Sequence, residues 1–359
     1  MFRRISVRLL IAAAALTSCF AAFTVAADAR GYRLKLAATF QVPVPADAIQ
    51  NGWCYDLAAV DPMTHRFYLA DAANKQLSVI DPMAGFIGGI GTGMFTGIAD
   101  CHHFNFEGQG PDGVIIRGND IYAGNGNSHV LGFSLTTGRQ IADPSTGGKL
   151  RADEMAVADR YLVVTNPAEK PSPYISVIDL RAKHHPVVAR FTFTHATGGI
   201  EQPQFWHGHL YISIPTTTES PTGGEVDELD ISNLHAVRII HRFVFSTCQP
   251  AGLAVDEEGV AAVGCGGPSS HDQQILSLRT GKQTPVKDVP GVDMVAAGGG
   301  DFFYVSYAKQ TFVVADRSGT VLQTFQATAA SHTVVVDRTN GDVWVPQDKG
   351  VVNLYAPAS

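Results

Sequence analysis

The chain has 359 residues, of which 45% are hydrophobic and 16% are charged, and its formal net charge at pH 7 is −7. A chain of this length and apolar content can bury a large core, and length alone allows two or three domains. The acidic balance, with no cluster of basic residues, argues against nucleic-acid binding, because that function needs basic side chains along the phosphate backbone.

The N-terminal residues have the pattern of an export signal. Three arginines precede an apolar run over Leu9–Ala27, which ends in the small residues Val-Ala-Ala. This pattern is typical of a secretory signal cut after Ala27 or Ala29. The stretch LTSC, ending at Cys19, resembles a bacterial lipobox and leaves open a lipidated N-terminus. Thr and Ser interrupt the apolar run, which argues against a retained membrane anchor. We therefore expect residues 1–27 to be the signal peptide of a periplasmic or secreted protein with no membrane span.

Four cysteines remain after the signal, and an even number in an exported chain favours disulfides. Cys248 and Cys265 flank the stretch QPAGLAVDEEGVAAVG, which predicts two strands around a turn at Glu257-Glu258. That register places the two cysteines almost opposite each other, so a cross-strand bridge is expected. Cys54 and Cys101 then pair by default, with a free or metal-bound pair as the alternative.

The rest of the chain repeats one pattern seven times. Each copy has a short strand, a turn, a second strand ending in small or aromatic residues, a polar loop, and a third strand that often reads Val-Ile-Asp. The spacing of most copies is roughly the 40 to 50 residues of a four-stranded propeller blade. The copies begin at Asp56, Asp112, Asp153, Glu201, Ala251, Asp293 and His332.

A fourth strand follows most third strands, as in PVVARFTFT and TVLQTFQA. The last copy stops at Tyr355 after its third strand, and the stretch Tyr32–Val44 can supply the missing one. This arrangement closes the ring with both ends of the chain and removes exposed sheet edges. We therefore predict an all-β fold over residues 28–359, a single seven-bladed β-propeller with four-stranded antiparallel blades. A pair of β-sandwiches would not explain seven copies in phase.

Three phrases carry a resemblance to a known family. VDPMTHRFYLA, its echo VDRTNGDVWVP, and Val-Ile-Asp at the ends of third strands are similar to the YVTN-repeat propellers, including the periplasmic YncE-like proteins. The likeness covers Asp56 to Tyr355. It implies a secreted propeller and no particular activity, since that group is functionally mixed and a fold does not fix a function.

Polar residues stand just before the first strand of six copies. In a propeller that strand lines the central channel, so these residues are expected to converge at one mouth of the channel. Their negative charge favours a divalent cation such as Ca²⁺, or a cationic ligand. The alternative is that each carboxylate accepts backbone N–H groups from the neighbouring blade. The candidate ligands are Asp56, Asp112, Asp153, Glu201 and Asp293, and His332 is the candidate general base.

The longest connection, Gly85 to Gly110, is expected to fold back as a lid on the same face, since loops of this length are usually functional or disordered. It contains Cys101, His102 and His103, and Trp53 lies beside it before the first copy. These residues predict either a Cys/His metal or nucleophile site, or a Cys54–Cys101 disulfide with the histidines as hydrogen-bonding loop residues. An oxidising compartment favours the disulfide.

The sequence lacks the G-x-S-x-G, H-E-x-x-H, C-x-x-C-H, P-loop and EF-hand patterns. The favoured function is therefore a non-enzymatic exported propeller that binds a small ligand or a periplasmic protein. A lactonase-like hydrolase or lyase is the first alternative, because a cation at the mouth would polarise a carbonyl and His332 would move the proton. The second is a redox subunit similar to amine-dehydrogenase heavy chains, which requires a companion cofactor subunit. Whether the chain is an enzyme stays open at this point.

Overall fold

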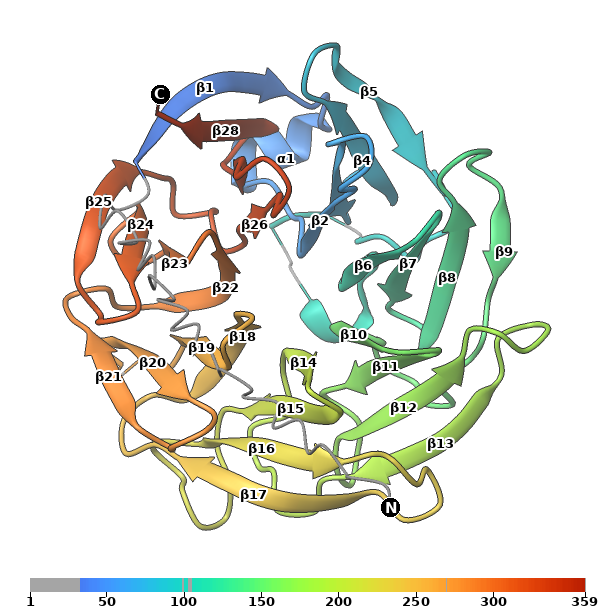
Figure 1. Ribbon diagram of the computed structural model, residues 1–359. Helices are drawn as coiled ribbons and strands as arrows, with labels where there is room; N and C mark the ends of the chain where they lie inside the picture. The colour runs from blue at the N-terminus through green and yellow to red at the C-terminus, as the bar shows by residue number, and fades with distance from the viewer. Residues whose placement is uncertain (1–32, 99, 103–104, 269, 359) are drawn as a thin grey trace, which may run out of the picture. The chain divides into compact units, whose positions relative to one another are not determined.

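A computed structural model describes residues 33–98, 100–102, 105–268 and 270–358. They form seven four-stranded antiparallel sheets arranged as a ring (Figure 1). The predicted all-β, seven-bladed propeller is therefore confirmed. The predicted signal peptide, Cys19 and His103 lie outside the described residues. None of the helices in the described part of the chain has the length and the run of apolar side chains that a membrane span needs.

Six blades follow one another along the chain, each running from the channel to the rim. The first three are β2 (Ala58–Val60), β3 (Phe67–Asp71), β4 (Gln76–Asp81) and β5 (Gly85–Ile90); β6 (Val114–Arg117), β7 (Asp120–Asn125), β8 (His129–Ser134) and β9 (Gln140–Ala142); and β10 (Met155–Ala158), β11 (Tyr161–Asn166), β12 (Tyr174–Asp179) and β13 (Val187–Thr192). The next three are β14 (Pro203–Trp206), β15 (His209–Ile214), β16 (Glu225–Asp230) and β17 (Arg238–Val244); β18 (Pro250–Val255), β19 (Val260–Cys265), β20 (Gln273–Ser277) and β21 (Gln283–Val286); and β22 (Val292–Gly298), β23 (Asp301–Ser306), β24 (Thr311–Asp316) and β25 (Val321–Gln326).

The seventh blade joins the two ends of the described chain. Its inner strands are β26 (Val335–Val336), β27 (Val343–Pro346) and β28 (Val351–Pro357), and its outer strand is β1 (Leu34–Gln41). β1 pairs antiparallel with β28, with Leu34 opposite Pro357 and Gln41 opposite Val351. The predicted closure of the ring by the N-terminal strand is confirmed, and it covers an edge that β28 would otherwise expose.

The burial of each strand follows its place in the blade. The second strands are packed between neighbouring blades, and β3 is buried at all of its positions. The outer strands face solvent on one side, and β13 alternates between half-buried and exposed residues. The sequence therefore shows continuous apolar runs in the middle strands and period-two alternation at the rim.

Both cysteine pairs lie at disulfide distance, as predicted. Cys248 and Cys265 have Cα atoms 4.6 Å apart, and they flank the β18–β19 hairpin in which Pro250 lies opposite Cys265. Cys54 and Cys101 have Cα atoms 5.6 Å apart. The second pair ties the long connection after the first blade to the segment that leads into β2.

The predicted connection from Gly85 to Gly110 is too long at its start, because residues 85–90 form the fourth strand of the first blade. Its glycines made this stretch resemble a loop. Gly89 lies against Gln76, and a Cβ built on it would meet the Gln76 Oε1 atom at 2.1 Å, so a larger residue there would displace the Gln76 side chain. The true connection begins at residue 91 and contains the short helix η1 (Phe106–Gly108).

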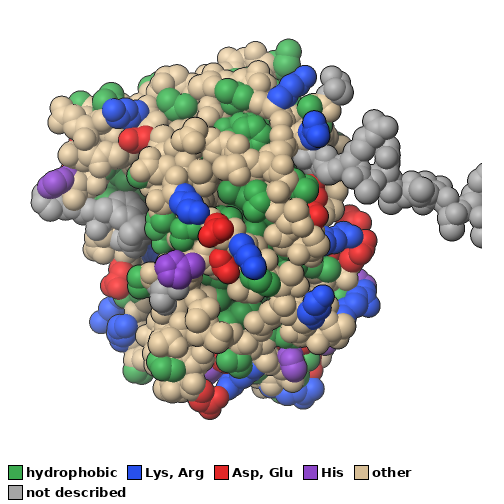
Figure 2. Space-filling view, turned by 90° about the vertical axis from the view of Figure 1, so that its left-hand side faces the viewer, with side chains coloured by type: hydrophobic (Ala, Val, Ile, Leu, Met, Phe, Trp, Pro, Cys, Tyr) green, Lys and Arg blue, Asp and Glu red, His purple; other side chains and the backbone are tan. Residues whose placement is uncertain are grey.

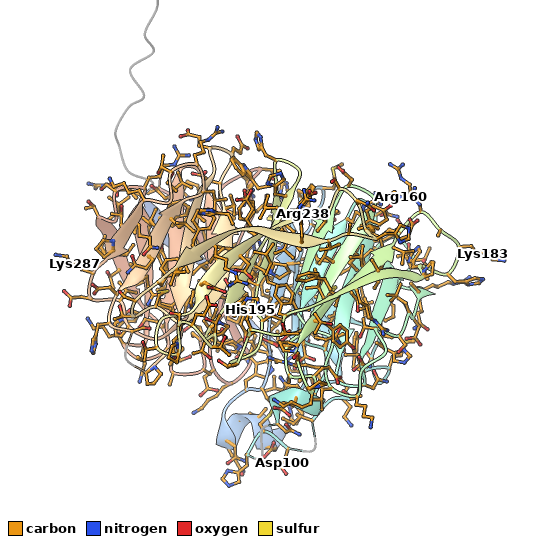
Figure 3. All side chains as sticks on the ribbon, turned by 90° about the horizontal axis from the view of Figure 1, so that it is seen from below. Asp100, Arg160, Lys183, His195, Arg238 and Lys287 are labelled. Carbon is orange, nitrogen blue, oxygen red and sulfur yellow. A yellow bond between two sulfur atoms is a disulfide. The ribbon has the colours of Figure 1, made fainter. Side chains whose placement is uncertain are left out.

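A helix that the sequence did not indicate stands beside this connection. α1 (Ala46–Asn51) lies between β1 and β2, and its Asp47 Oδ2 accepts a hydrogen bond from the Cys101 backbone N–H at 2.5 Å. Figure 3 shows α1 and the segment at Asp100 projecting together from one face of the ring.

Candidate functional site at the channel mouth

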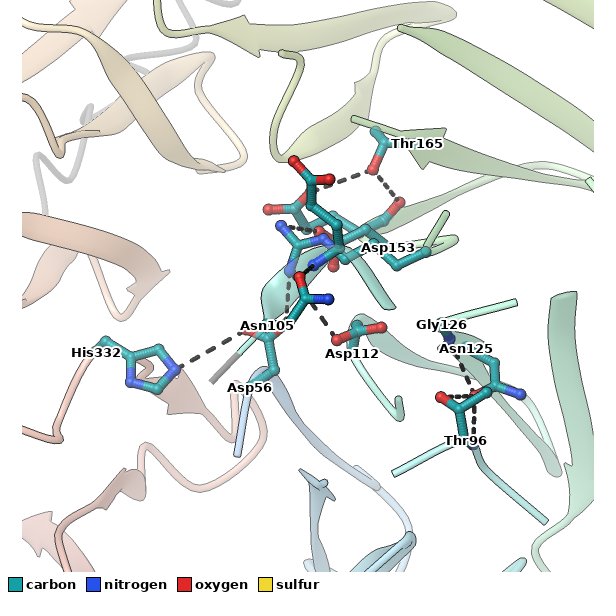
Figure 4. A network of polar contacts seen from close by, with 12 residues as sticks. Asp56, Thr96, Asn105, Asp112, Asn125, Gly126, Asp153, Thr165 and His332 are labelled. Carbon is teal, nitrogen blue, oxygen red and sulfur yellow. Dashed lines mark hydrogen bonds and ion pairs between the residues drawn. The ribbon is translucent and has the colours of Figure 1, made fainter. Parts of the chain in front are cut away.

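The structure brings most of the predicted ring residues to one end of the channel. A cavity of about 380 Å³ there is lined by side chains that include Asp56, Asp153, Glu201 and Asp293. Asp112 is fully buried beside this group (Figure 4). We call these five residues, together with Glu154 in the same cavity lining, the acidic mouth.

The blades position four of these residues in the same way. Each lies two residues before an inner strand, and its backbone N–H donates to a carbonyl of the second strand of its own blade. This bond fixes the backbone, and the side chain is left at the channel. The four bonds are Asp56 to Ala70 at 2.9 Å, Asp112 to Gly124 at 3.2 Å, Asp153 to Thr165 at 2.9 Å and Glu201 to Ser213 at 2.8 Å.

Neighbouring blades approach each other closely at the mouth. A Cβ built on Gly113 would lie 2.3 Å from the backbone oxygen of Asp153, so only glycine fits at this contact. Burial raises the pKa of the Asp153 carboxyl group, and the nearby Gly113 backbone N–H acts in the opposite direction. Asp153 therefore lines the cavity and also lies against the backbone of the preceding blade.

Lys170 also lines the mouth cavity, but the buried cation of the mouth is Arg151, which the sequence analysis did not single out. Its guanidinium lies 2.8 Å from Asp153 Oδ2, 3.6 Å from Asp56 Oδ2 and 4.0 Å from Asp112 Oδ1 (Figure 4). Its side chain is only 13% exposed, and its backbone N–H donates to Glu107 O at 2.8 Å. A positive charge close in sequence to the predicted cation ligands could have pointed to Arg151. However, Arg151 lies two residues before the repeated position and so falls outside the repeat.

Glu154 is the second residue that the repeat did not reveal, although it directly follows Asp153. Thr165 Oγ1 donates to Glu154 Oε2 at 3.2 Å, and carboxylate oxygens of Asp153, Glu154 and Glu201 lie within 4.8 Å of one another. Burial raises the pKa of Glu154 and Glu201, and neighbouring carboxylates act in the same direction. A bound cation would favour release of the protons that these raised pKa values retain.

Burial raises the pKa of every carboxyl group in the acidic mouth. It raises the pKa of Asp56 to about 6, that of Asp153 to about 7 and that of Glu201 to about 8, while Arg151 acts in the opposite direction on all three. Burial also raises the pKa of the carboxyl groups of Asp112, Glu154 and Asp293. These six carboxyl groups therefore hold protons at higher pH than exposed carboxyl groups do, and a bound cation would favour their ionised forms.

Four buried carboxylate oxygens in this group have no hydrogen-bond partner among the residues that the structure describes. They are Asp56 Oδ2, Asp112 Oδ1, Asp112 Oδ2 and Asp153 Oδ1. Arg151 lies near the first at 3.6 Å, which is an ion-pair distance but not a hydrogen bond. Buried carboxylate oxygens of this kind are normally satisfied by a donor or a cation.

His332 faces the mouth in a defined orientation. Its Nδ1 lies 2.8 Å from the backbone oxygen of Ala330, and because a carbonyl only accepts, Nδ1 carries the proton. In its neutral form the ring presents an unprotonated Nε2, which lies 3.9 Å from Asp56 Oδ1. The ring stacks on Tyr55 with centroids 4.7 Å apart, and the Tyr55 hydroxyl donates to Ala330 O at 2.7 Å. Tyr55 and Ala330 thus hold the imidazole in place.

The predicted lid residues lie away from the cavity. Trp53 is buried, and its Nε1–H donates to Asp71 Oδ1 at 3.0 Å, so its indole belongs to the first blade's core. His102 is exposed and does not line the mouth cavity. Glu107 is the residue of this connection that reaches the cavity lining.

The acidic mouth opens into an apolar channel. A second cavity of about 510 Å³ is lined by the inner strands of the blades, largely by Ala, Val, Ile and Met side chains. Leu57 and Met294 line both cavities, so the two adjoin. The far end is marked by Met63 and Arg338 on turns of the opposite face. The channel therefore offers negative charge at one end and an apolar wall along its length.

No protein-family model matches the chain, and no curated protein matches it. Among solved structures, 1595 chains match, a number that makes the fold too common to select a function. One is a chain in a structure described as "Crystal Structure of Mitotic Checkpoint Complex", with a TM-score of 0.66 and 11% identity over 90% of this chain and 95% of that one. The chain thus shares a seven-bladed propeller fold with known structures. Its function must therefore be inferred from the residues at its own channel mouth.

Proposed function

We propose that this protein is an exported propeller that binds a small organic cation with an apolar portion at the acidic mouth of its channel. The observation that carries the proposal is the junction of the two cavities at Leu57 and Met294. An ammonium group would lie among the carboxylates, and its hydrocarbon portion would enter the apolar channel. Ligand sites commonly combine an apolar wall with a few charged groups that fix orientation.

The size and contents of the mouth favour an organic cation over a bare ion. A volume of about 380 Å³ is in the range of small-molecule sites. The position between Asp56, Asp112 and Asp153, where an ion would bridge three blades, is close to the Arg151 guanidinium. The organic cation would therefore bind away from Arg151, on the side of Glu201 and Asp293, where the cavity continues.

Export is supported by the sequence and by the cysteines. The first 27 residues have the pattern of a cleaved signal, and both cysteine pairs of the propeller lie at disulfide distance. Disulfides of this kind persist in oxidising compartments. The resemblance to YVTN-repeat, YncE-like propellers supports the same location.

The test is a calorimetric titration with hexyltrimethylammonium, a permanent cation with an apolar chain, and with 1-hexanol as its neutral counterpart. We expect one site for the cation, and binding at least about 10-fold weaker in Asp56→Asn/Asp293→Asn, since an ionic contact contributes about 1.4 kcal/mol or more. The matched control is Glu257→Gln/Glu258→Gln, which removes two exposed charges from the β18–β19 turn. Equal binding by the mouth variant and the control, or binding of hexanol alone, would contradict the proposal.

The second candidate function is that of a hydrolase or lyase that uses a divalent cation at the mouth. One observation favours it: carboxylate oxygens of Asp153, Glu154 and Glu201 lie within 4.8 Å of one another. Ca²⁺ binds oxygen ligands of this type, and a cation there would polarise a carbonyl while His332 Nε2 accepts a proton. Titration with Ca²⁺, followed by a screen of lactones with wild-type protein and His332→Gln, tests this candidate.

A further inference from the structure

A second polar cluster, whose side chains do not line the mouth cavity, lies at the junction of the third and fourth blades. His195 follows β13, the outer strand of the third blade, while Glu225 and Asp227 belong to β16 of the fourth. Glu225 and Asp227 are two positions apart on one strand, so their side chains point to the same face of the sheet. Figure 3 shows His195 at the side of the ring.

The three side chains converge on one point. His195 Nε2 lies 3.0 Å from Glu225 Oε1 and 3.1 Å from Asp227 Oδ2. A single Nε2–H cannot donate well to both carboxylates at once. For comparison, the ligand atoms of a tetrahedral Zn²⁺ site, with bonds of 2.0–2.1 Å, are separated by roughly 3.3 Å. The imidazole and the two carboxylates therefore already stand near the spacing of metal ligands.

Both carboxylates are deeply buried and incompletely satisfied. The Glu225 side chain is 1% exposed and that of Asp227 is 0% exposed. Within the described part of the chain, Asp227 Oδ1 has no hydrogen-bond partner. Arg242 is the nearest cation to it, but its Nε is 3.8 Å from Asp227 Oδ1 and equally far from Glu225 Oε1. This distance supplies charge without a hydrogen bond.

The first blade has a different polar residue, with a different partner, at the position that Asp227 occupies in the fourth blade. The residue that matches Asp227 in the strand register is Ser78 in the first blade, where its hydroxyl donates to Asp71 at the end of the second strand at 2.7 Å. In the fourth blade the second strand ends in Ile214, opposite Glu225. The two acids therefore have no polar partner at the end of the second strand, and a histidine from the preceding blade takes that place, while Arg242 lies opposite Asp227 on β17.

The loop around the cluster fixes the histidine. The Thr218 N–H donates to the His195 backbone oxygen at 3.0 Å, and Ala196 forms a bridge with Thr217. These contacts hold His195 against the connection between β15 and β16. Supporting contacts of this kind orient a metal ligand before the ion arrives.

We propose that His195, Glu225 and Asp227 bind a divalent transition-metal ion of the Zn²⁺ class. One imidazole nitrogen and two carboxylate oxygens are ligands that Zn²⁺ accepts, and three protein ligands leave a fourth position for water. Because the ligand nitrogen must be unprotonated, the ion displaces a proton from Nε2 on binding. Arg242, with a 35% exposed side chain that also reaches Glu219 at 3.6 Å, turns outward as the metal charge replaces its own.

The direct test is calorimetric titration of the full chain with Zn²⁺. We expect one equivalent bound at this site, with affinity reduced about 100-fold in His195→Ala and in the isosteric Asp227→Asn. His209→Ala is the matched control, because His209 contacts a single acid, Glu228, in the same sheet. Asp56→Asn/Asp293→Asn separates this site from the mouth, and both controls should keep the Zn²⁺ affinity of the wild type. Equal binding by His195→Ala and the wild type, or no binding by the wild type, would overturn the proposal.

Arg242→Met provides a second test, which distinguishes a metal site from a purely structural ion pair. Removing a competing cation should tighten Zn²⁺ binding about 10-fold, and the visible absorption of the Co²⁺ form should show a low coordination number that His195→Gln abolishes. Unchanged or weaker metal binding in Arg242→Met would instead identify the cluster as a network of ion pairs. Near-ultraviolet circular dichroism of each variant shows whether it has folded.

Discussion

Arg151 is the residue on which the electrostatics of the mouth depend. It is the buried positive charge within ion-pair distance of Asp56, Asp112 and Asp153. Each of these carboxylates lost its hydration on burial and is stabilised in its charged form mainly by this guanidinium. Removal of the guanidinium should therefore be costly, and the cost should depend on whether the carboxyl groups are ionised.

Arg151→Met should lower the free energy of unfolding by about 3–5 kcal/mol at pH 8, the usual loss when one partner of a buried ion pair is removed. At pH 5 the loss should be smaller, because carboxyl groups with pKa values of about 6 and 7 are then protonated. Denaturant unfolding at the two pH values measures the difference. Arg317→Met, at the partly exposed pair with Asp256, should cost less than about 1 kcal/mol at both. A loss independent of pH would contradict this description of the mouth.

Glu201 provides a test of the opposite sign. Burial raises its pKa in the folded protein to about 8, above its ordinary value of 4.5. The folded state therefore holds a proton that the unfolded chain releases, and the resulting stability is fully present below pH 4.5 and is lost as the pH rises through 8. Glu201→Gln cannot ionise, so it should be more stable than the wild type at pH 9 by about 1–2 kcal/mol and nearly equal to it at pH 4. The same difference at both pH values would show that ionisation is not involved.

The sequence predicts the residues of the mouth only where they follow the repeat. Asp56, Asp112, Asp153 and Glu201 could be found because each occupies the same position before an inner strand. Arg151 lies outside that position, and its role becomes visible only when neighbouring blades are placed side by side. The sequence placed Trp53 beside the predicted lid, but it gave no sign that the Trp53 indole donates a hydrogen bond to Asp71 within the first blade.

At the scale of elements, the contact between β6 and β10 determines the shape of the mouth. Gly113 lies next to Asp112 and immediately before β6, and it approaches the backbone of Asp153. Gly113→Ala should force these two blades apart, because its Cβ would come within 2.3 Å of Asp153 O. We expect a loss of about 1–3 kcal/mol in unfolding free energy and weaker cation binding. Gly266→Ala, whose Cβ would meet nothing closer than 3.6 Å, is the control. If the two variants behave alike, the close approach does not shape the site.

Strands could be predicted from the sequence where apolar periodicity was strong. The β18–β19 hairpin and the pairing of β1 with β28 agree with the prediction. β5 was missed, because Gly-rich strands carry little periodic signal, and its glycine at residue 89 is explained by a cross-strand contact with Gln76. The short helix α1 has six residues and no side-chain cap, so no local pattern indicated it.

At the scale of the whole molecule, the ring concentrates acidic residues at one end of a single channel. Figure 2 shows the outer side near β22–β25, where acidic and basic side chains are interspersed without a large patch of one sign. The mouth differs from that surface, because six carboxyl groups from five blades meet around one guanidinium. The fold could be predicted from repeat length and ring closure, whereas the balance of charge at the mouth depends on contacts between blades that no single repeat contains.

The most direct test of the central claim is the pH dependence of hexyltrimethylammonium binding. This ligand keeps its charge at every pH, so a change in affinity reports the protein alone. Because the carboxyl groups of Asp56, Asp153 and Glu201 have pKa values of about 6, 7 and 8 and bind a cation when ionised, affinity should rise between pH 5.5 and 8.5 with release of protons. An affinity that does not change with pH, or that falls as the pH rises, would contradict a cation site at the acidic mouth.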